Sequence, residues 1–171
     1  VGERGEAWPP APPGRPCLLV PGQVEDDASV RYGSPQLRSN QALLQAVRAR
    51  HPEAFIVYKP HPDVLAGLRA GQIDDPVAQG WADALIEQMP MPDCLQHCDA
   101  VHTLTSLAGF EALIRGVPVV CYGQPFYAGW GLTEDVLPLA RRTARLDLDT
   151  LMHAVLIDYP LYTLGPGGGG L

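Results

Sequence analysis

The chain has 171 residues, of which 46% are hydrophobic, and is long enough for one domain with a buried core. Its formal net charge of −7 provides no basic field to hold nucleic acid or anionic lipid, so no nucleic-acid partner is expected. The apolar runs, such as residues 17–20 and 117–122, are far shorter than the roughly 20 residues that span a bilayer. No secretory signal is visible, which predicts a cytoplasmic location.

The two ends differ in composition from the middle of the chain. Residues 1–16, VGERGEAWPPAPPGRP, are rich in Pro and Gly without periodicity, which predicts a linker. Residues 17–160 are expected to form the folded domain, and the Gly-rich residues 161–171 a flexible tail. Four cysteines are too few for a disulfide scaffold at this length, and we interpret them as buried thiols.

Short β-rich runs alternate with helical patterns along the domain. In chain order we expect a strand at 17–20, a helix at 40–50, a strand at 55–58, a helix at 63–70, a weak strand at 84–87, a helix at 91–98, a strand at 100–104, a helix at 106–115, a strand at 117–122 and a helix at 147–158. This alternation predicts an α/β, Rossmann-like fold with a doubly wound parallel sheet. Ligands bind such sheets beyond the carboxyl ends of the strands, so the loops there form the candidate site.

The loop after the first predicted strand carries Gln23 and three consecutive acids, Glu25, Asp26 and Asp27. Three adjacent acids could bind a metal ion. The alternative is a solvated loop in which Asp27 or Ser29 caps a helix. The spacing matches no recognisable ligand set, so these residues alone identify neither a metal site nor a cofactor site.

Histidines and cysteines in the middle of the chain form a second group of potential metal ligands. They are Cys94, His97, Cys98 and His102. Their spacing matches no common structural zinc site, so this sequence does not predict one. His51 and His153 fall in or beside predicted helices and are interpreted as surface or hydrogen-bonded histidines.

The loop after the second predicted strand reads YKPHP, and its two prolines restrict the backbone on either side of His61. A fixed imidazole beside Lys59 suits an anionic group, because both side chains donate charge-assisted hydrogen bonds to phosphate oxygens. The alternative is a rigid loop in which His61 merely satisfies a neighbouring carbonyl.

The loop after the strand at 100–104 offers Thr105 and Ser106 as N-caps for the next helix. Free amides at a helix N-terminus bind anions, although capping alone also explains these residues. Glu111 lies about one and a half turns into that helix, within reach of a ligand that crosses its first turn.

The last candidate loop, residues 123–133, contains three glycines, three aromatic residues and Gln124. An ordered loop of this kind lines a base or sugar pocket in one interpretation and is purely structural in the other.

Three segments together resemble the capsule polysaccharide biosynthesis proteins that transfer β-Kdo. They are YKPHPDV (58–64), CDAVHTLTSLAGFEALIRGVPVVCYG (98–123) and QPFYAGWGLTED (124–135). The likeness spans most of residues 17–160. A His-Pro motif, a Thr-Ser pair before a helix, Glu-x4-Gly-x-Pro and the aromatic loop occur in order, which makes the combination specific.

The resemblance implies one half of a GT-B-like glycosyltransferase with two Rossmann-like domains. This chain would be the C-terminal, donor-binding half of a retaining enzyme that transfers Kdo from CMP-β-Kdo to a lipid-linked acceptor. The implied donor contacts are His61, Thr105 and Ser106 for the phosphate, Glu111 for the ribose, and Gln23 and Gln124 for the base or sugar. Lys59 is a further candidate contact beside His61.

The acceptor-binding half and the acidic nucleophile expected within it are absent from this sequence, so the resemblance implies that this chain alone is inactive. It implies no metal and a location that is cytoplasmic, at most peripheral at the inner face of the inner membrane. Two alternatives stay open: a non-enzymatic nucleotide-binding or scaffolding module of a capsule assembly complex, and a GT-B-type epimerase that binds a UDP-sugar. Acceptor identity and oligomeric state do not follow from the sequence.

Overall fold

A computed structural model describes residues 6–158, in which six strands form one sheet with the order β3-β2-β1-β4-β5-β6. The strands are β1 (Cys17–Pro21), β2 (Phe55–Lys59), β3 (Ala84–Leu85), β4 (Ala100–Thr103), β5 (Val119–Cys121) and β6 (Glu134–Asp135). Every neighbouring pair is parallel. The expected α/β parallel sheet is therefore confirmed.

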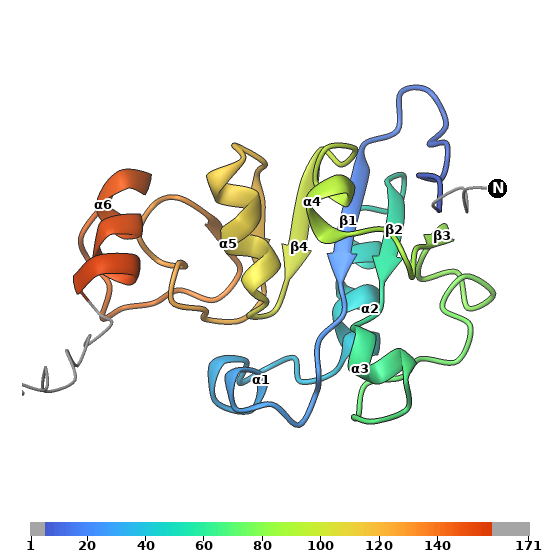
Figure 1. The fold of residues 1–171 in the computed structure, drawn as a ribbon, viewed down its shortest axis with the longest axis horizontal. Helices are drawn as coiled ribbons and strands as arrows, with labels where there is room; N and C mark the ends of the chain where they lie inside the picture. The colour runs from blue at the N-terminus through green and yellow to red at the C-terminus, as the bar shows by residue number, and fades with distance from the viewer. Residues whose placement is uncertain (1–5, 159–171) are drawn as a thin grey trace, which may run out of the picture.

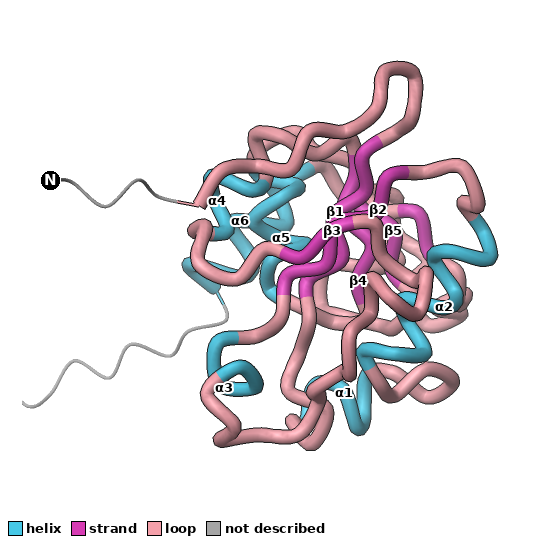
Figure 2. Tube along the Cα trace, turned by 90° about the vertical axis from the view of Figure 1, so that its right-hand side faces the viewer, coloured by secondary structure: helices cyan, strands magenta, loops and turns pink. Residues whose placement is uncertain are grey.

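Helices cover both faces of the sheet, as Figure 2 shows, with α2 on one side and α4, α5 and α6 on the other. The helices are α1 (Ala28–Gly33), α2 (Asn40–Arg50), α3 (Pro62–Leu65), α4 (Met91–Cys94), α5 (Leu107–Ile114) and α6 (Leu148–His153), and α6 continues as one turn of π-helix, η1 (Ala154–Asp158). α1 and α3 lie beyond the carboxyl ends of β1 and β2 (Figure 1).

The strand order makes this a Rossmann-like, doubly wound sheet. The chain builds outward from β1 through β2 to β3, returns to the middle at β4, and continues outward on the other side through β5 to β6. Connections leave β1 and β4 in opposite directions, so a crevice is expected between their carboxyl ends. This switch point is the place where such folds bind ligands.

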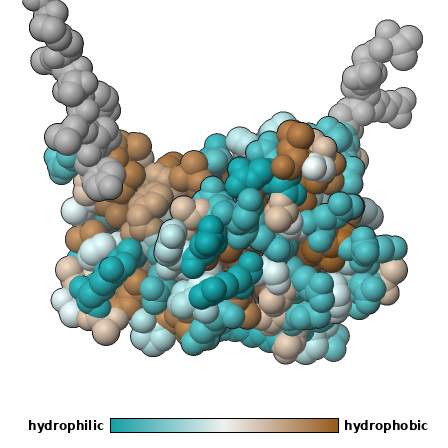
Figure 3. All heavy atoms as spheres, turned by 90° about the horizontal axis from the view of Figure 1, so that it is seen from below, coloured by the Kyte–Doolittle hydropathy of each residue, from teal (hydrophilic) through white to brown (hydrophobic). Residues whose placement is uncertain are grey.

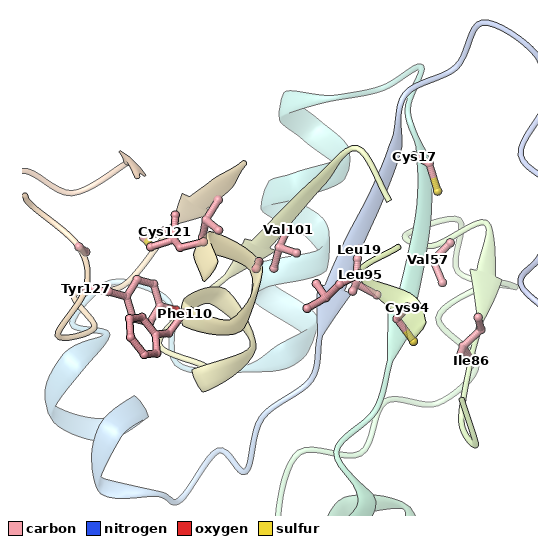
Figure 4. Close-up of a cluster of buried hydrophobic side chains, with 14 of the residues drawn as sticks. Cys17, Leu19, Val57, Ile86, Cys94, Leu95, Val101, Phe110, Cys121 and Tyr127 are labelled. Atoms are coloured by element: carbon pink, nitrogen blue, oxygen red, sulfur yellow. The ribbon is translucent and has the colours of Figure 1, made fainter. Parts of the chain in front are cut away.

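The sheet divides the core into two apolar layers, because alternate side chains of a strand point to opposite faces. In β1, Leu19 belongs to the layer that also contains Phe110 of α5 and Leu95 after α4, whereas Val20 belongs to the layer that contains the apolar residues of α2. Figure 4 shows the first layer, with Phe110 and Tyr127 side by side at one end. All residues of β1 and β2 are buried, which explains their almost unbroken apolar sequences.

Several boundaries differ from those predicted by sequence. The helix expected at 63–70 ends at Leu65, because Gly67 takes a positive φ of 72° and the amide of Leu68 bonds to the carbonyl of Asp63, a Schellman-type ending. The helix expected at 91–98 is likewise limited to α4. The short elements α1 and β6 were not predicted at all.

The segment predicted as a linker contains no helix or strand between residues 6 and 16, yet it packs on the domain. Trp8 contacts the core layer, and the carboxylate of Glu6 accepts hydrogen bonds from three consecutive amides that begin at Glu87. Arg15 pairs with Asp83 at 3.2 Å. The tail predicted at 161–171 lies outside the described residues, and the division into linker, domain and tail stays a prediction.

Candidate functional site

The loops that follow β1, β2, β4 and β5 come together at the carboxyl edge of the sheet, the lower end in Figure 1. An inner hollow of about 210 Å³ is lined by Gln23, Val24, Asp27, Ser29, His61, Thr105, Ser106 and Leu107. An outer hollow of about 340 Å³ is lined by Ala28, Ser29, Tyr32, Gly33, Thr105, Gln124, Pro125, Phe126 and Arg141. The two hollows share Ser29 and Thr105 and so adjoin one another. Figure 3 looks onto this edge and shows hydrophilic and hydrophobic residues side by side.

Close backbone approach joins these loops. The amide of Gln124 donates to the carbonyl of Gly33 at 2.6 Å, which connects the loop after β5 to the end of α1. A Cβ atom at Gly123 would lie 2.7 Å from the carbonyl oxygen of Leu104 and 2.9 Å from that of Gly33. A glycine is therefore required where the three segments meet.

Gln23 spans the switch point between β1 and β4. Its Oε1 accepts from the amide of Thr105 at 2.9 Å, and its Nε2 donates to Thr105 Oγ1 at 2.9 Å. The buried Asn40 holds the backbone of Gln23 by two hydrogen bonds of 2.8 Å, one accepted from its amide and one donated to its carbonyl. Gln23 thus fixes the position of Thr105, a role that its sequence position alone did not indicate.

His61 is both the N-cap of α3 and part of the inner hollow. Its Nδ1 accepts from the amide of Asp63 at 3.2 Å, so in the neutral ring the proton resides on Nε2. The carboxylate of Asp63 lies 4.0 Å from Nδ1. Because Nδ1 is the acceptor for the amide of Asp63, Nε2 is the ring nitrogen that can donate a hydrogen bond.

The N-terminus of α5 supplies further donors. The amide of Ser106 bonds to Thr103 Oγ1 at 3.2 Å, and Ser106 Oγ accepts from the amide of Ala108 at 3.1 Å. The amide of Leu107 makes no hydrogen bond within residues 6–158, and Leu107 lines the inner hollow. Sequence reasoning missed Leu107, although its place directly after an N-cap is the available signal.

The structure does not bring all the sequence-predicted residues together. Gln23, His61, Thr105, Ser106 and Gln124 line the two hollows. Lys59 is nearly buried, and its Nζ donates to the carbonyl of Glu87 at 3.1 Å beside a different hollow. Glu111 lies on the second turn of α5 and lines neither hollow.

The three acids after β1 each have a structural partner. Glu25 accepts from the amide of Asn40 at 2.7 Å, and Asp26 pairs with Arg69 at 3.1 Å. Asp27 caps α1 through the amide of Ser29, and this hydrogen bond lowers the pKa of Asp27. Within residues 6–158 no group of three or more His, Cys, Asp or Glu side chains is arranged to hold a metal ion.

The aromatic loop, residues 123–133, packs against the N-terminus of α5. Tyr127 is fully buried, and its hydroxyl donates to the carbonyl of Ser106 at 2.5 Å. A Cβ atom at Gly109 would lie 2.2 Å from that hydroxyl, so Gly109 allows the loop to contact α5. Phe126 is 40% exposed and lines the outer hollow. Tyr127 therefore has a structural role, whereas the lining of a base or sugar pocket by this loop stays a prediction.

Outside the two hollows, His102 and three of the four cysteines are buried, whereas His97 and His153 are exposed. His102 packs edge-on against His51 and lies 3.2 Å from the hydroxyl of Tyr122, and burial lowers the pKa of His102 to about 3. The four cysteines are free thiols, of which Cys98 is half-buried and the others are buried. Burial raises the pKa of Cys98 and of Cys121 to about 12, which leaves both thiols protonated.

Comparison with known proteins places the chain in a family. The profile described as capsule polysaccharide biosynthesis protein matches residues 9–162. The chain belongs to this family. It is 59% identical over 145 residues to the capsule polysaccharide modification protein LipA of Neisseria meningitidis serogroup B, covering 85% of this chain and 21% of LipA. It is 42% identical over 157 residues to the lipopolysaccharide-processing protein LpsZ of Rhizobium meliloti, covering 92% of this chain and 36% of LpsZ.

Solved structures of family-like proteins share the fold. KpsC of Thermosulfurimonas dismutans, a β-Kdo 2,7 transferase, superposes with a TM-score of 0.75 at 45% identity, covering 84% of this chain and 46% of that one. The β-Kdo 2,4 transferase of the same organism gives 0.72 at 34% identity, covering 88% and 48%. The chain thus spans less than half the length of these relatives. Between residues 6 and 158 no helix is both long and apolar enough to cross a membrane.

Proposed function

We propose that this chain is the donor-binding half of a retaining β-Kdo transferase and that CMP-β-Kdo binds at the carboxyl edge of its sheet. The phosphate would occupy the inner hollow. The observation that carries this proposal is the convergence of His61, Thr105 and Leu107 beside the switch point between β1 and β4, where the amide of Leu107 has no hydrogen-bond partner among residues 6–158. Similarity to two β-Kdo transferases supports the identity of the sugar.

The chemistry of the leaving group fits these donors. CMP departs as a phosphate monoester, and negative charge develops on its phosphate as the glycosidic bond breaks. His61, Thr105 and Leu107 line the hollow in which that charge would develop. The donors that would stabilise this charge are the Nε2–H of His61, the hydroxyl of Thr105 and the amide of Leu107. The positive end of the α5 dipole adds to their effect. Loss of one such preorganised donor typically costs about 2.7 to 4 kcal/mol of transition-state stabilisation.

The other predicted contacts take different roles. Gln23 holds Thr105 in place, and Gln124 in the outer hollow contacts the base or the sugar. Lys59 and Glu111 lie outside both hollows and reach the donor only where it extends beyond them. Neither a metal nor a cofactor is part of this proposal.

The acceptor side of the reaction is assigned to the rest of a longer protein. The relatives are longer than this chain, and glycosyl transfer in a two-domain enzyme takes place in the cleft between the domains. The nucleophile and the lipid-linked acceptor would come from the second half, at the inner face of the inner membrane. Glu25, Asp26 and Asp27 are poor nucleophiles because each is held by a structural partner.

Calorimetric titration of the 171-residue chain with CMP, CDP and UDP tests the proposal. We expect CMP to bind and UDP to bind at least about tenfold more weakly. A preference for UDP would instead favour a UDP-sugar epimerase. Absence of binding by all three nucleotides would overturn the assignment of the inner hollow.

A further inference from the structure

The outer hollow combines chemical groups that suit an acidic sugar. Tyr32, which is 82% exposed, and Phe126 offer aromatic surfaces, and Gln124 supplies an amide. Among the residues that the structure describes, Arg141 is the one charged side chain in the lining, and none of their carboxylates lines this hollow. In a chain with a net charge of −7, a lining that contains an arginine would favour an anion.

Arg141 and Arg142 are neighbours with different roles. The guanidinium of Arg142 donates to the carbonyls of Pro125, Phe126 and Ala128 and lies 5.2 Å from the ring centroid of Trp130. Nη1 of Arg142 therefore binds the backbone of the aromatic loop. Arg141, in contrast, makes no hydrogen bond or ion pair with any residue from 6 to 158. Arg142 thus holds the loop in place, while Arg141 lines the outer hollow as a cation with no partner among residues 6–158.

We infer that Arg141 binds the carboxylate of the donor sugar and that the outer hollow is the subsite for an acidic sugar. This inference rests on the proposed function. Kdo is a keto-sugar acid, and its carboxylate is bonded to the same anomeric carbon as the oxygen of the phosphate link. The two anions must therefore lie next to each other. The two hollows meet this requirement, because they adjoin through Ser29 and Thr105.

The charges of the two anions explain why each would need its own binding group. A phosphate in the inner hollow would use His61 and the N-terminus of α5, which leaves the adjacent carboxylate without a counter-charge. An arginine pairs with a carboxylate through two parallel N–H donors, which fixes orientation as well as charge. Arg141 thereby discriminates between an acidic sugar nucleotide and one with a neutral sugar.

The test compares the affinities of CMP and freshly prepared CMP-Kdo for the 171-residue chain, by calorimetry. The variants are Arg141→Gln and the control Arg31→Gln, which removes the same charge from exposed α1 without touching either hollow. We expect the wild-type chain to bind CMP-Kdo more tightly than CMP. Arg141→Gln should weaken CMP-Kdo binding about tenfold, the low end for a hydrogen bond to a charged group, and leave CMP binding unchanged. Arg31→Gln should change neither affinity.

The other outcomes contradict the inference in distinguishable ways. Equal weakening of both ligands by Arg141→Gln would place the arginine on the nucleotide, and no weakening of either would exclude a contact. Equal affinity of the wild-type chain for CMP and CMP-Kdo would refute the sugar subsite but would still agree with the proposed nucleotide site. Failure of the wild-type chain to bind CMP at all would overturn the proposed function, and the subsite with it.

Discussion

Replacement of His61 by asparagine separates its two roles. Asparagine is a favourable N-cap, so His61→Asn retains an acceptor for the amide of Asp63 but removes the Nε2–H from the inner hollow. The fold should therefore persist while phosphate binding weakens. His61→Ala, which removes both functions, should additionally lose about 0.5 to 2 kcal/mol of stability.

The expected magnitude follows from the exposure of the ring. A hydrogen bond to a charged group contributes about 1.5 to 3 kcal/mol, and the His61 side chain is 39% exposed, which favours the lower figure. The Kd for CMP should then rise about tenfold. His153→Asn is the matched control, because His153 also lies beside an aspartate, Asp158 at 3.1 Å, but on α6 and η1, outside both hollows.

Calorimetric titration gives the Kd for CMP, and thermal unfolding monitors the fold in parallel. Unchanged CMP affinity in His61→Asn would refute the assignment and leave His61 as a helix cap alone. A loss of the cooperative unfolding transition in this variant would show that the imidazole is required for the structure itself.

Three further predictions concern stability and activity. Tyr127→Phe removes the hydrogen bond to Ser106 and should cost about 1 kcal/mol, whereas Gly109→Ala should cost more because its methyl group overlaps the Tyr127 hydroxyl; thermal unfolding measures both. Burial holds the pKa of His102 near 3, below the usual 6.5, so the unfolding free energy should fall by about 1.4 kcal/mol per pH unit as pH drops through this interval. In His102→Asn, the free energy of unfolding measured with urea should fall less steeply as pH drops. An unchanged slope would show that the buried His102 is not the cause of the pH dependence. The 171-residue chain should bind CMP yet transfer no Kdo to a Kdo-primed acceptor by mass spectrometry, because one domain cannot bring the acceptor within reaction distance; transfer by this chain would move the nucleophile onto the acids after β1.

Local patterns predicted much of the fold. The apolar runs at 17–20 and 55–58 correspond to β1 and β2, and the helix predicted at 40–50 matches α2. These elements are recognisable because burial on both faces of a parallel sheet requires unbroken apolar strands. In contrast, α1 buries one side chain, Val30, and β6 has two residues, so neither leaves a periodic signal.

The sequence by itself determined the α/β class, the loops that form the candidate site and most of the polar residues in them. Only the tertiary structure decided which hydrogen bonds those residues make. Gln23 and Thr105 are 82 positions apart and bond because β1 and β4 are neighbours at the switch point. For a similar reason, Arg142 donates to three carbonyls of the aromatic loop, whereas Arg141 has no hydrogen-bond or ion-pair partner among residues 6–158. Hydrogen-bond partners depend on which strands and loops become neighbours. Packing across the whole sheet decides which segments are neighbours, so the local sequence does not predict these partners.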